Sequence, residues 1–390
     1  MTPIHKTILK HILLNEKMSK STLAKAIGMS KTRIGKQVEQ IINNGFLHEN
    51  GFLPVNGPGR LQGCLEINPG TFYSCGISII SDCMEIGIFD AKVNLIKKKH
   101  YKNPFLSGIH DAKDIDNALT NISELFYSFL REINFDKNKI CVVGFSLPGI
   151  INTHSGVILR SPFFPGIKEY PIGKKLSDKV NIPVIIEDFH KAKTYFEYHR
   201  GAGRGSKNML YISSRSGTFG IIINGELFYG SGYRAGQTSA FVIDPQGPMS
   251  DWGIKGTLGS YFSIPAFLKQ IEQIPISQET AHLKNIVTEE HLKKMFISGE
   301  LVTCQIIREA SVYLGKALCN LMTLLPVDVI MIDHWLSSHP ECCIDIINQE
   351  LQRYVLASIG PEIKIQASKF EVDNYPLHIA YLASVRYFET

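Results

Sequence analysis

The stretch that most constrains the fold of this chain is "STLAKAIGMSKTRIGKQVEQI", residues 21–41. Ser30 stands at a helix N-cap position, and apolar residues then recur at the spacing of one helix face: Ile34, Val38 and Ile41. A shorter helix is predicted just before it, and Gly28 lies in the turn between the two. Because two helices joined by a short Gly-containing turn are typical of a helix-turn-helix, we predict helices at about 21–26 and 31–43.

The sequence on either side of these helices completes a small module. Residues 6–16 predict a first helix, with apolar side chains on one face. The segment "GFLHENGFLPVN" alternates apolar and polar residues around Asn50-Gly51, which predicts a β-hairpin with its turn at that dipeptide. Three helices and a hairpin make a winged helix-turn-helix, to which we assign residues 1–66, connector included.

The positive charge of the chain is concentrated in this module. Residues 1–63 hold nine Lys or Arg and three acidic residues, whereas the rest holds 32 basic and 33 acidic residues. This asymmetry favours a small module that meets a polyanion, followed by a near-neutral body. Lys31, Arg33 and Lys36 stand in the first two turns of the predicted 31–43 helix, where the helix dipole disfavours cations.

The placement of these cations suits DNA, because recognition helices present their N-terminal residues to base edges in the major groove. Lys and Arg suit guanine, Gln suits adenine, and Thr suits phosphate or a thymine methyl group. Hydroxyl side chains that open the preceding helix are placed to hydrogen-bond phosphate. We predict that these residues contact double-stranded DNA: Ser21, Thr22, Ser30, Lys31, Thr32, Arg33, Lys36, Gln37 and Arg60. For Arg60 two interpretations stay open, a minor-groove contact and an ordinary linker arginine.

From about residue 65 the sequence has an α/β texture. Three strands are predicted over residues 72–101, then a helix at about 112–133, further strands, and a buried strand that feeds a helix. A second β-meander, turning at Asn224-Gly225, begins about 135 residues after the first, and helices fill much of 264–325. The recurrence predicts two α/β lobes of related plan that face a cleft.

Cysteine usage and hydropathy indicate the cellular setting. The eight cysteines are scattered and form no CxxC pair, which favours a reducing compartment. The chain opens on no signal-peptide pattern, and no apolar run is long enough to span a membrane. We expect a cytoplasmic protein without a membrane partner.

With these segments in order, the chain resembles the ROK family, which contains sugar kinases and sugar-responsive transcription repressors. The resemblance is carried by "GPGRLQGCLEINP", "VVGFSLPGIINTHSGVILRSPFF", "RGAGRGSKNMLYI" and "GTFGIIINGELFYGSGYRAGQTSAFVIDPQG". It implies an α/β fold in which a winged helix-turn-helix precedes a two-lobed, actin-like body that binds sugar in its cleft and dimerises. The body would span 67–390. Lobe one would take about 67–187 plus a C-terminal helix at about 372–390, and lobe two about 188–371.

The nucleotide motifs of the kinase members are missing. Those members carry a DxGGT turn whose glycines cradle phosphate; here the region reads "GISIISDC", with Ser78 for the acid and Ile80 and Ser81 for the glycines. A β-branched side chain obstructs close approach of backbone to phosphate. The second glycine pair is Asp333-His334, and an acid there repels phosphate. We expect no ATP binding, no enzyme activity and no cofactor.

The zinc site of the family is also missing. Its histidine position holds Ala240, and its three cysteine positions hold Ser250, Trp252 and Thr257. Zinc needs thiolate or imidazole ligands, so we expect no bound metal. Trp252 has two interpretations: it packs where the metal would hold the loop, or it is an ordinary half-buried tryptophan.

The sugar site is partly erased. By the resemblance, the family's Glu, His and third acidic contact are Gln237, Ala240 and Gly259 here, and Phe163 stands where an Asn is frequent. Asp188 matches the acid that accepts sugar hydroxyls in repressors, and Glu187 stands beside it. We take Glu187, Asp188 and Gln237 as candidate effector contacts. An N-cap for the next helix is the alternative role of Asp188.

These observations favour a homodimeric DNA-binding transcription regulator, a repressor, whose degenerate ROK body senses an effector and dimerises. A modified sugar, a phosphosugar, another metabolite or no small molecule stay open as effector. The alternative is a regulator whose body docks a partner protein, for which the apolar segment "FSIPAFL" (262–268) is the candidate surface. A sugar kinase with an added DNA-binding module is the third interpretation.

Overall fold

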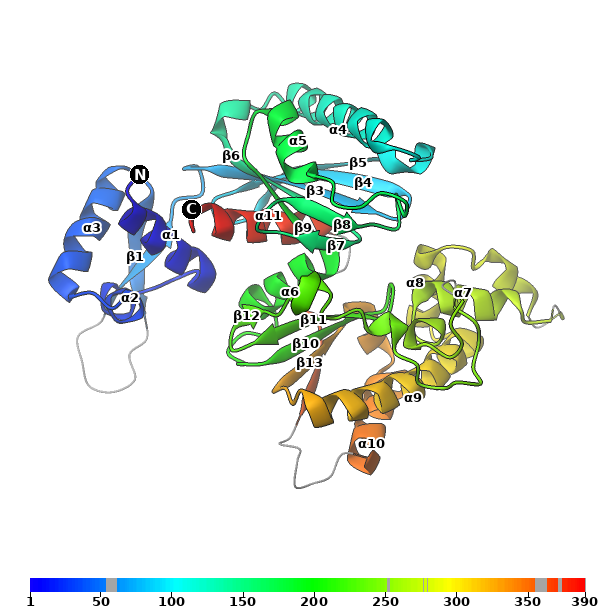
Figure 1. Cartoon of the computed structure of the whole chain (residues 1–390). Coiled ribbons are helices and arrows are strands. Elements are labelled where there is room, and N and C mark those ends of the chain that lie inside the picture. Colours follow the sequence, from blue (N-terminus) through cyan, green and yellow to red (C-terminus); the bar gives the residue numbers. More distant parts are fainter. Residues whose placement is uncertain are drawn as a thin grey trace. The chain divides into compact units, whose positions relative to one another are not determined.

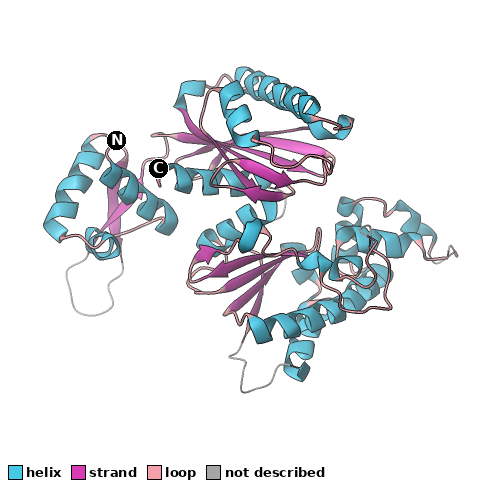
Figure 2. Cartoon of the chain, viewed as in Figure 1, coloured by secondary structure: helices cyan, strands magenta, loops and turns pink. Residues whose placement is uncertain are grey.

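The computed structural model describes residues 1–53, 62–250, 253–275, 277–278, 280–354, 363–370 and 374–389. The chain forms two compact units, residues 1–199 with 374–390, and residues 200–373 (Figure 1). Each unit is built around a β-sheet with helices packed on it (Figure 2). No helix in the described ranges is long and apolar enough to cross a membrane.

The first unit begins with a small domain, here called the head, of three helices and two strands. Its elements are α1 (Pro3–Asn15), α2 (Lys20–Ile27), α3 (Lys31–Asn43), β1 (Leu47–Leu53) and β2 (Gln62–Ile67). The bounds predicted for α3 are confirmed, and α1 begins at Pro3 because Thr2 caps it by accepting a hydrogen bond from the His5 amide. The two strands pair antiparallel, as a wing requires.

The hairpin turn predicted at Asn50-Gly51 is wrong. β1 runs through this dipeptide and pairs with β2, on the far side of residues 54–61, which lie outside the described residues. The register shifts between Glu49 and Phe52, and Gly51 has φ +67°. A glycine with positive φ accommodates a β-bulge as readily as a tight turn, so the dipeptide signal did not distinguish the two.

The rest of the first unit is a lobe around a five-stranded sheet of order β5-β4-β3-β6-β9. Its strands are β3 (Tyr73–Ile80), β4 (Cys83–Asp90), β5 (Leu95–Lys102), β6 (Ile140–Leu147) and β9 (Val184–Asp188). The small strands β7 (Ile150–Asn152) and β8 (Val157–Arg160) pair separately. The three strands predicted over residues 72–101 are confirmed.

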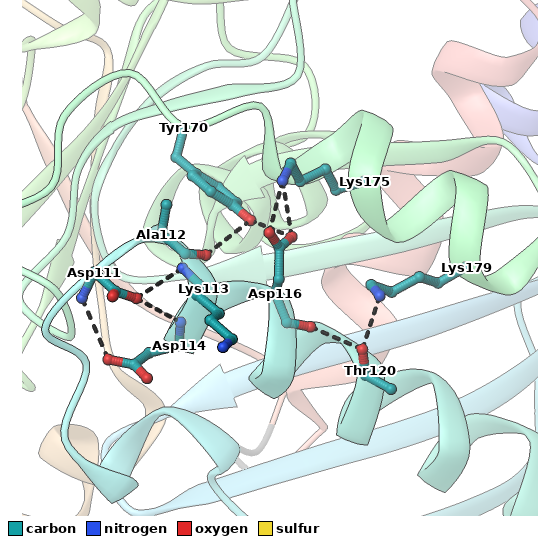
Figure 3. Close-up of polar contacts among 9 residues, drawn as sticks. All are labelled: Asp111, Ala112, Lys113, Asp114, Asp116, Thr120, Tyr170, Lys175 and Lys179. Carbon is teal, nitrogen blue, oxygen red and sulfur yellow. Dashed lines mark hydrogen bonds and ion pairs between the residues drawn. The ribbon is translucent and has the colours of Figure 1, made fainter.

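Helices cover both faces of this sheet. One face packs on α4 (Ala112–Glu132) and α5 (Ile172–Val180), and the other on α11 (Tyr375–Tyr387) (Figure 1). Between α4 and α5, Asp116 accepts hydrogen bonds from the Lys175 ammonium group at 2.8 and 2.9 Å and from the Tyr170 hydroxyl at 2.5 Å (Figure 3). These contacts fix the two helices to each other on the side away from α11.

The second unit repeats the plan of the first lobe, as the sequence predicted. Its sheet has the order β12-β11-β10-β13-β14, with β10 (Met209–Ser213), β11 (Thr218–Ile223), β12 (Glu226–Leu227), β13 (Val329–Ile332) and β14 (Lys364–Ala367). In both sheets three antiparallel strands precede two parallel ones. Its longer helices are α7 (Ile264–Glu272), α8 (Glu289–Ile297), α9 (Leu301–Leu324) and α10 (Ile344–Tyr354). The turn at Asn224-Gly225 is confirmed, with φ values of 51° and 87°.

The helix that follows β9, α6 (Phe189–Arg200), belongs to the first unit up to His199. The sequence places the boundary between the lobes earlier, at 187/188. The rings of Tyr195 and Phe196 contact Tyr381 of α11, with centroids 6.1 and 5.4 Å apart. These aromatic contacts join α6 to the helix that covers the first sheet.

Candidate functional site

Capping fixes where the two helices of the helix-turn-helix begin. Ser30 caps α3, as predicted, by accepting a hydrogen bond from the Arg33 amide at 3.3 Å. Ser19 caps α2 by accepting one from the Thr22 amide at 3.0 Å. Between the helices Gly28 takes φ +73° and ends α2, a conformation that favours glycine. The local sequence therefore sets both helix starts and the sharp turn between them.

Helix α3 has an apolar inner face and a basic outer face. Its inner residues are fully buried, as predicted: Ile34, Val38 and Ile41. On the outer side Lys31, Thr32, Arg33 and Lys36 are exposed, and Gln37 is half-buried. The structure thus brings five of the residues predicted for DNA contact onto the open side of one helix.

The ion pairs of the head distinguish two groups of cations. Three lysines outside α3 are paired with acids: Lys10 with Glu389 at 2.7 Å, Lys17 with Glu66 at 2.9 Å and Lys20 with Glu49 at 2.5 Å. By contrast, Lys31, Arg33 and Lys36 have no acidic partner among the residues that the structure describes. Lys6 and Lys25 have no acidic partner in the described residues either, but only the three cations of α3 stand in its first two turns, where the helix dipole disfavours them.

The hydroxyl residues predicted for phosphate contact need one correction. α2 opens at Lys20, not at Ser21, because Ser19 is its cap. The Ser19 hydroxyl is also hydrogen-bonded to those of Ser21 and Thr22, at 2.9 Å each. Ser21 is half-buried and Thr22 is exposed, so Thr22 is the better placed of the two for a phosphate. Arg60 lies outside the described residues.

The candidate effector acid Asp188 ends β9 and caps α6. Its Oδ1 accepts hydrogen bonds from the amides of His190 and Lys191, at 3.0 and 3.2 Å, and its Oδ2 accepts one from Gly149 at 3.3 Å. Burial raises the pKa of this carboxyl, against the lowering effect of these donors. The capping role is therefore present, and a ligand contact would have to share the same carboxylate.

The other two candidate effector residues lie in different surroundings. Glu187 is fully buried and faces α11, where its Oε2 lies 3.1 Å from the guanidinium of Arg386. Gln237 belongs to the second unit, at the start of the short turn Thr238–Ala240. Asp188 and Glu187 are adjacent at the end of β9, so their side chains lie on opposite faces of the sheet.

The positions that the resemblance assigns to the nucleotide motifs of kinase members make polar contacts within the chain. The hydroxyls of Ser78 and Ser146 are buried and 2.7 Å apart. In the second unit the Asp333 carboxylate accepts hydrogen bonds from the Tyr211 hydroxyl at 2.5 Å and from the Ser214 amide at 2.7 Å. The Asp333 carboxylate, which the resemblance places at the second glycine pair of the kinase members, is thus bonded within the chain.

The loop that would hold zinc is held by other contacts. The Tyr261 hydroxyl donates to Asp244 Oδ2 at 2.6 Å, and the Gly256 amide donates to the Pro248 carbonyl at 2.8 Å. In the described parts of the chain no cluster of three or more His, Cys, Asp or Glu is arranged to hold a metal ion. Trp252 lies outside those parts, so both of its interpretations stay open.

Comparison with known proteins decides the family. A family model described as the ROK family matches residues 74–383. The chain belongs to the ROK family. The xylose repressor of Bacillus subtilis (strain 168) is 25% identical over 367 residues, which cover 93% of this chain and 90% of the repressor. The DNA-binding transcriptional repressor Mlc of Escherichia coli (strain K12) is 20% identical, covering 90% of this chain and 86% of that protein.

Solved structures show the same fold. A ROK family transcriptional regulator, described as a homolog of the E. coli MLC protein, matches with TM-score 0.80 and 19% identity, covering 100% of this chain and 98% of that one. A ROK family glucokinase from Streptomyces griseus matches with TM-score 0.65 and 20% identity, covering 80% of this chain and 99% of that one. The predicted winged helix-turn-helix and two-lobed body are thereby confirmed as the fold.

Proposed function

We propose that this ROK protein is a DNA-binding transcription regulator, a repressor, whose head spans residues 1–66 and whose body spans 67–390. The observation that carries the proposal is the exposed basic start of α3. Lys31, Arg33 and Lys36 have no acidic partner in the described residues, although other lysines of the head do. DNA phosphates supply negative charge for these unpaired cations, and guanine edges supply hydrogen-bond acceptors for them. The repressors that are similar over more than nine-tenths of this chain support the assignment.

The body acts in this proposal as a sensor and dimerisation platform in the cytoplasm. A dimer presents two recognition helices to two half-sites on one face of DNA. An effector with different affinities for two body conformations would then shift the position of the heads. Asp188 and Gln237 are the proposed effector contacts. Glu187 is a weaker candidate, because its carboxylate is buried against Arg386.

The proposal excludes sugar kinase activity. Among the named relatives, the glucokinase of Halalkalibacterium halodurans is 25% identical over 260 residues. By the resemblance, however, Ile80 and Ser81 replace the phosphate-cradling glycines of the kinase turn, and Ser78, bonded to Ser146, replaces its acid. The bonded carboxylate of Asp333 stands at the second glycine pair. ATP-dependent phosphorylation of glucose or a hexosamine by the purified protein would contradict this part.

A second candidate function is docking of a partner protein by the body. The prediction that segment 262–268 forms the docking surface is wrong, because Phe262, Ile264 and Phe267 are buried. Four apolar side chains of the preceding loop are exposed instead, by 39 to 53%: Phe241, Val242, Met249 and Ile254. A partner that co-purifies after nuclease treatment, and that a Val242→Asp/Met249→Asp variant loses, would favour this function.

The test of the DNA-binding function is genome-wide capture of bound DNA, followed by titration of the selected fragments against salt. We expect sites with two half-sites and a binding constant that falls steeply with salt concentration. A panel of sugars and sugar derivatives is then added to look for a change in affinity. Weak binding without sequence preference would contradict the proposal.

A further inference from the structure

α11 lies against the sheet of the first lobe with almost no space between them. Gly76, Gly87 and Gly144 are cross-strand neighbours on β3, β4 and β6 and form a row beneath the helix. A Cβ atom at Gly76 would lie 2.0 Å from the Pro376 carbonyl oxygen, and one at Gly144 would lie 2.5 Å from that of Ile379. Because backbone meets backbone here, the sheet fixes the position of α11 closely.

Arg386, in the last turn of α11, ties the helix to the end of strand β9. Its Nη2 donates to Glu187 Oε2 at 3.1 Å, and its Nη1 donates to the Thr153 hydroxyl. The other oxygen of Glu187 accepts a hydrogen bond from the Asp188 amide at 2.9 Å. One buried carboxylate therefore joins α11 to the backbone of the residue that caps α6.

The residues that follow Arg386 contact the head. The ring of Tyr387 lies beneath the Lys6 ammonium group, with 5.4 Å from the nitrogen to the ring centroid, and Glu389 pairs with Lys10. Phe388 packs edge-to-face on Phe72, with centroids 5.1 Å apart. Both lysines belong to α1, so the end of α11 is held against the first helix of the head.

α1 in turn contacts the recognition helix. His5 Nε2 and Gln40 Oε1 lie 3.3 Å apart, which joins α1 to α3. Ile8, Leu9 and Ile12 of α1 are fully buried in the head. A displacement of α1 is therefore passed to α3 through packed side chains, which resist a change of volume.

We propose that Arg386 is a positioning residue that couples the Asp188 end of β9 to the recognition helix, through the last turn of α11 and through α1. The inference rests on the DNA-binding function proposed above and specifies how that function is regulated. A ligand that hydrogen-bonds to the Asp188 carboxylate would displace the Asp188 amide, which donates to Glu187. The disturbance would then reach α11 through Arg386, and the head through Lys10 and Lys6.

Hydrogen exchange of the intact chain without DNA tests the coupling independently of DNA binding. We compare Arg386→Gln with Lys175→Gln, a matched control that breaks the ion pair with Asp116 on the other face of the sheet (Figure 3). Arg386→Gln is expected to raise amide exchange about fivefold or more in the last turn of α11 and also in α1. Lys175→Gln is expected to leave α1 unchanged, and Arg386→Lys to restore most of the protection.

A second pair of variants tests the same coupling if Arg386→Gln does not fold. Lys10→Gln and Glu389→Gln remove a partly exposed pair, and each is expected to raise exchange in α1 while β9 keeps its protection. A faster exchange in α11 with α1 unchanged would overturn the proposal, as would unchanged exchange in α1 for both surface variants. The DNA capture described above decides separately whether the head binds DNA, so the two failures are distinguishable.

Discussion

The carboxylate of Glu66 lies 2.5 Å from the ammonium group of Lys92, which bonds a strand of the head to a turn of the first lobe. Lys17, between α1 and α2, reaches the same carboxylate at 2.9 Å. Hydrogen bonds from Lys92, and then from Lys17, lower the pKa of Glu66 to about 2 although burial opposes the shift. One buried carboxylate thus bonds a lysine within the head, Lys17, and a lysine of the first lobe, Lys92.

Glu66→Gln is expected to lower the free energy of unfolding at pH 7 by about 1–3 kcal/mol, because it leaves two ammonium groups without their carboxylate. The pKa of Glu66 is lower in the folded than in the unfolded state. Its contribution is therefore fully present above about pH 4.5 and is lost as the pH falls toward 2. Unfolding measured between pH 3 and pH 7 should show the difference between variant and parent shrink with acidification.

The matched control for this measurement is Glu49→Gln, which breaks the exposed pair with Lys20 in the same head. Exposed pairs contribute little, so its effect should stay below about 0.5 kcal/mol. A Glu66→Gln deficit that is the same at every pH would show that the side chain acts by packing and not by charge.

Arg33→Ala and Lys36→Ala are each expected to weaken binding to a selected DNA site by about 1–3 kcal/mol. A residue that contacts a base changes the sequence preference, whereas a phosphate contact lowers the salt slope by about one. Competition titrations at several salt concentrations separate the two roles. Lys139→Ala is the control, since it removes one exposed cation from the body. Unchanged affinity for both α3 variants would place α3 outside the interface.

Ser30→Asp separates the stability of α3 from its contact with DNA. Asp is as good an N-cap as Ser and interacts favourably with the helix dipole, so thermal stability without DNA should stay equal or rise. The added carboxylate would face phosphate, and DNA affinity should fall by about tenfold or more. Ser30→Ala should show the reverse pattern, a loss of about 1 kcal/mol of stability with a smaller effect on DNA. Wild-type affinity of Ser30→Asp would place Ser30 away from the phosphates.

Local patterns predicted the helix-turn-helix well. The bounds of α3 follow from a capping serine and a helical repeat of apolar residues, and both signals lie within the helix itself. The related plan of the two lobes was also predictable, because the strands and turns of each β-meander follow one another directly in the sequence. The hairpin turn of the wing was misplaced, since Gly51 lies at a bulge and the partner strand begins at Gln62.

Contacts between distant residues were not predictable from the sequence. Glu187 and Arg386 are 199 positions apart, and only folding of α11 onto the first sheet brings them together. The same holds for Tyr211 and Asp333, which meet because β10 and β13 are neighbours in the second sheet. In the sequence, Asp333 reads as an isolated acid that would repel phosphate. In the structure its carboxylate accepts hydrogen bonds from Tyr211 and Ser214.

The loop between Phe241 and Tyr261 should keep its structure without metal. Tyr261 stacks on Tyr313 at 3.7 Å between ring centroids, and its hydroxyl donates to Asp244. The purified protein should therefore hold no stoichiometric zinc, and a chelator should leave its melting temperature unchanged. Tyr261→Phe keeps the ring and loses only the hydrogen bond, so it should raise protease cleavage and amide exchange within this loop. Tyr127→Phe, which loses a hydrogen bond to the Val180 carbonyl in the first unit, should leave the loop protected. One zinc ion per chain, released together with the fold of the loop, would contradict the prediction.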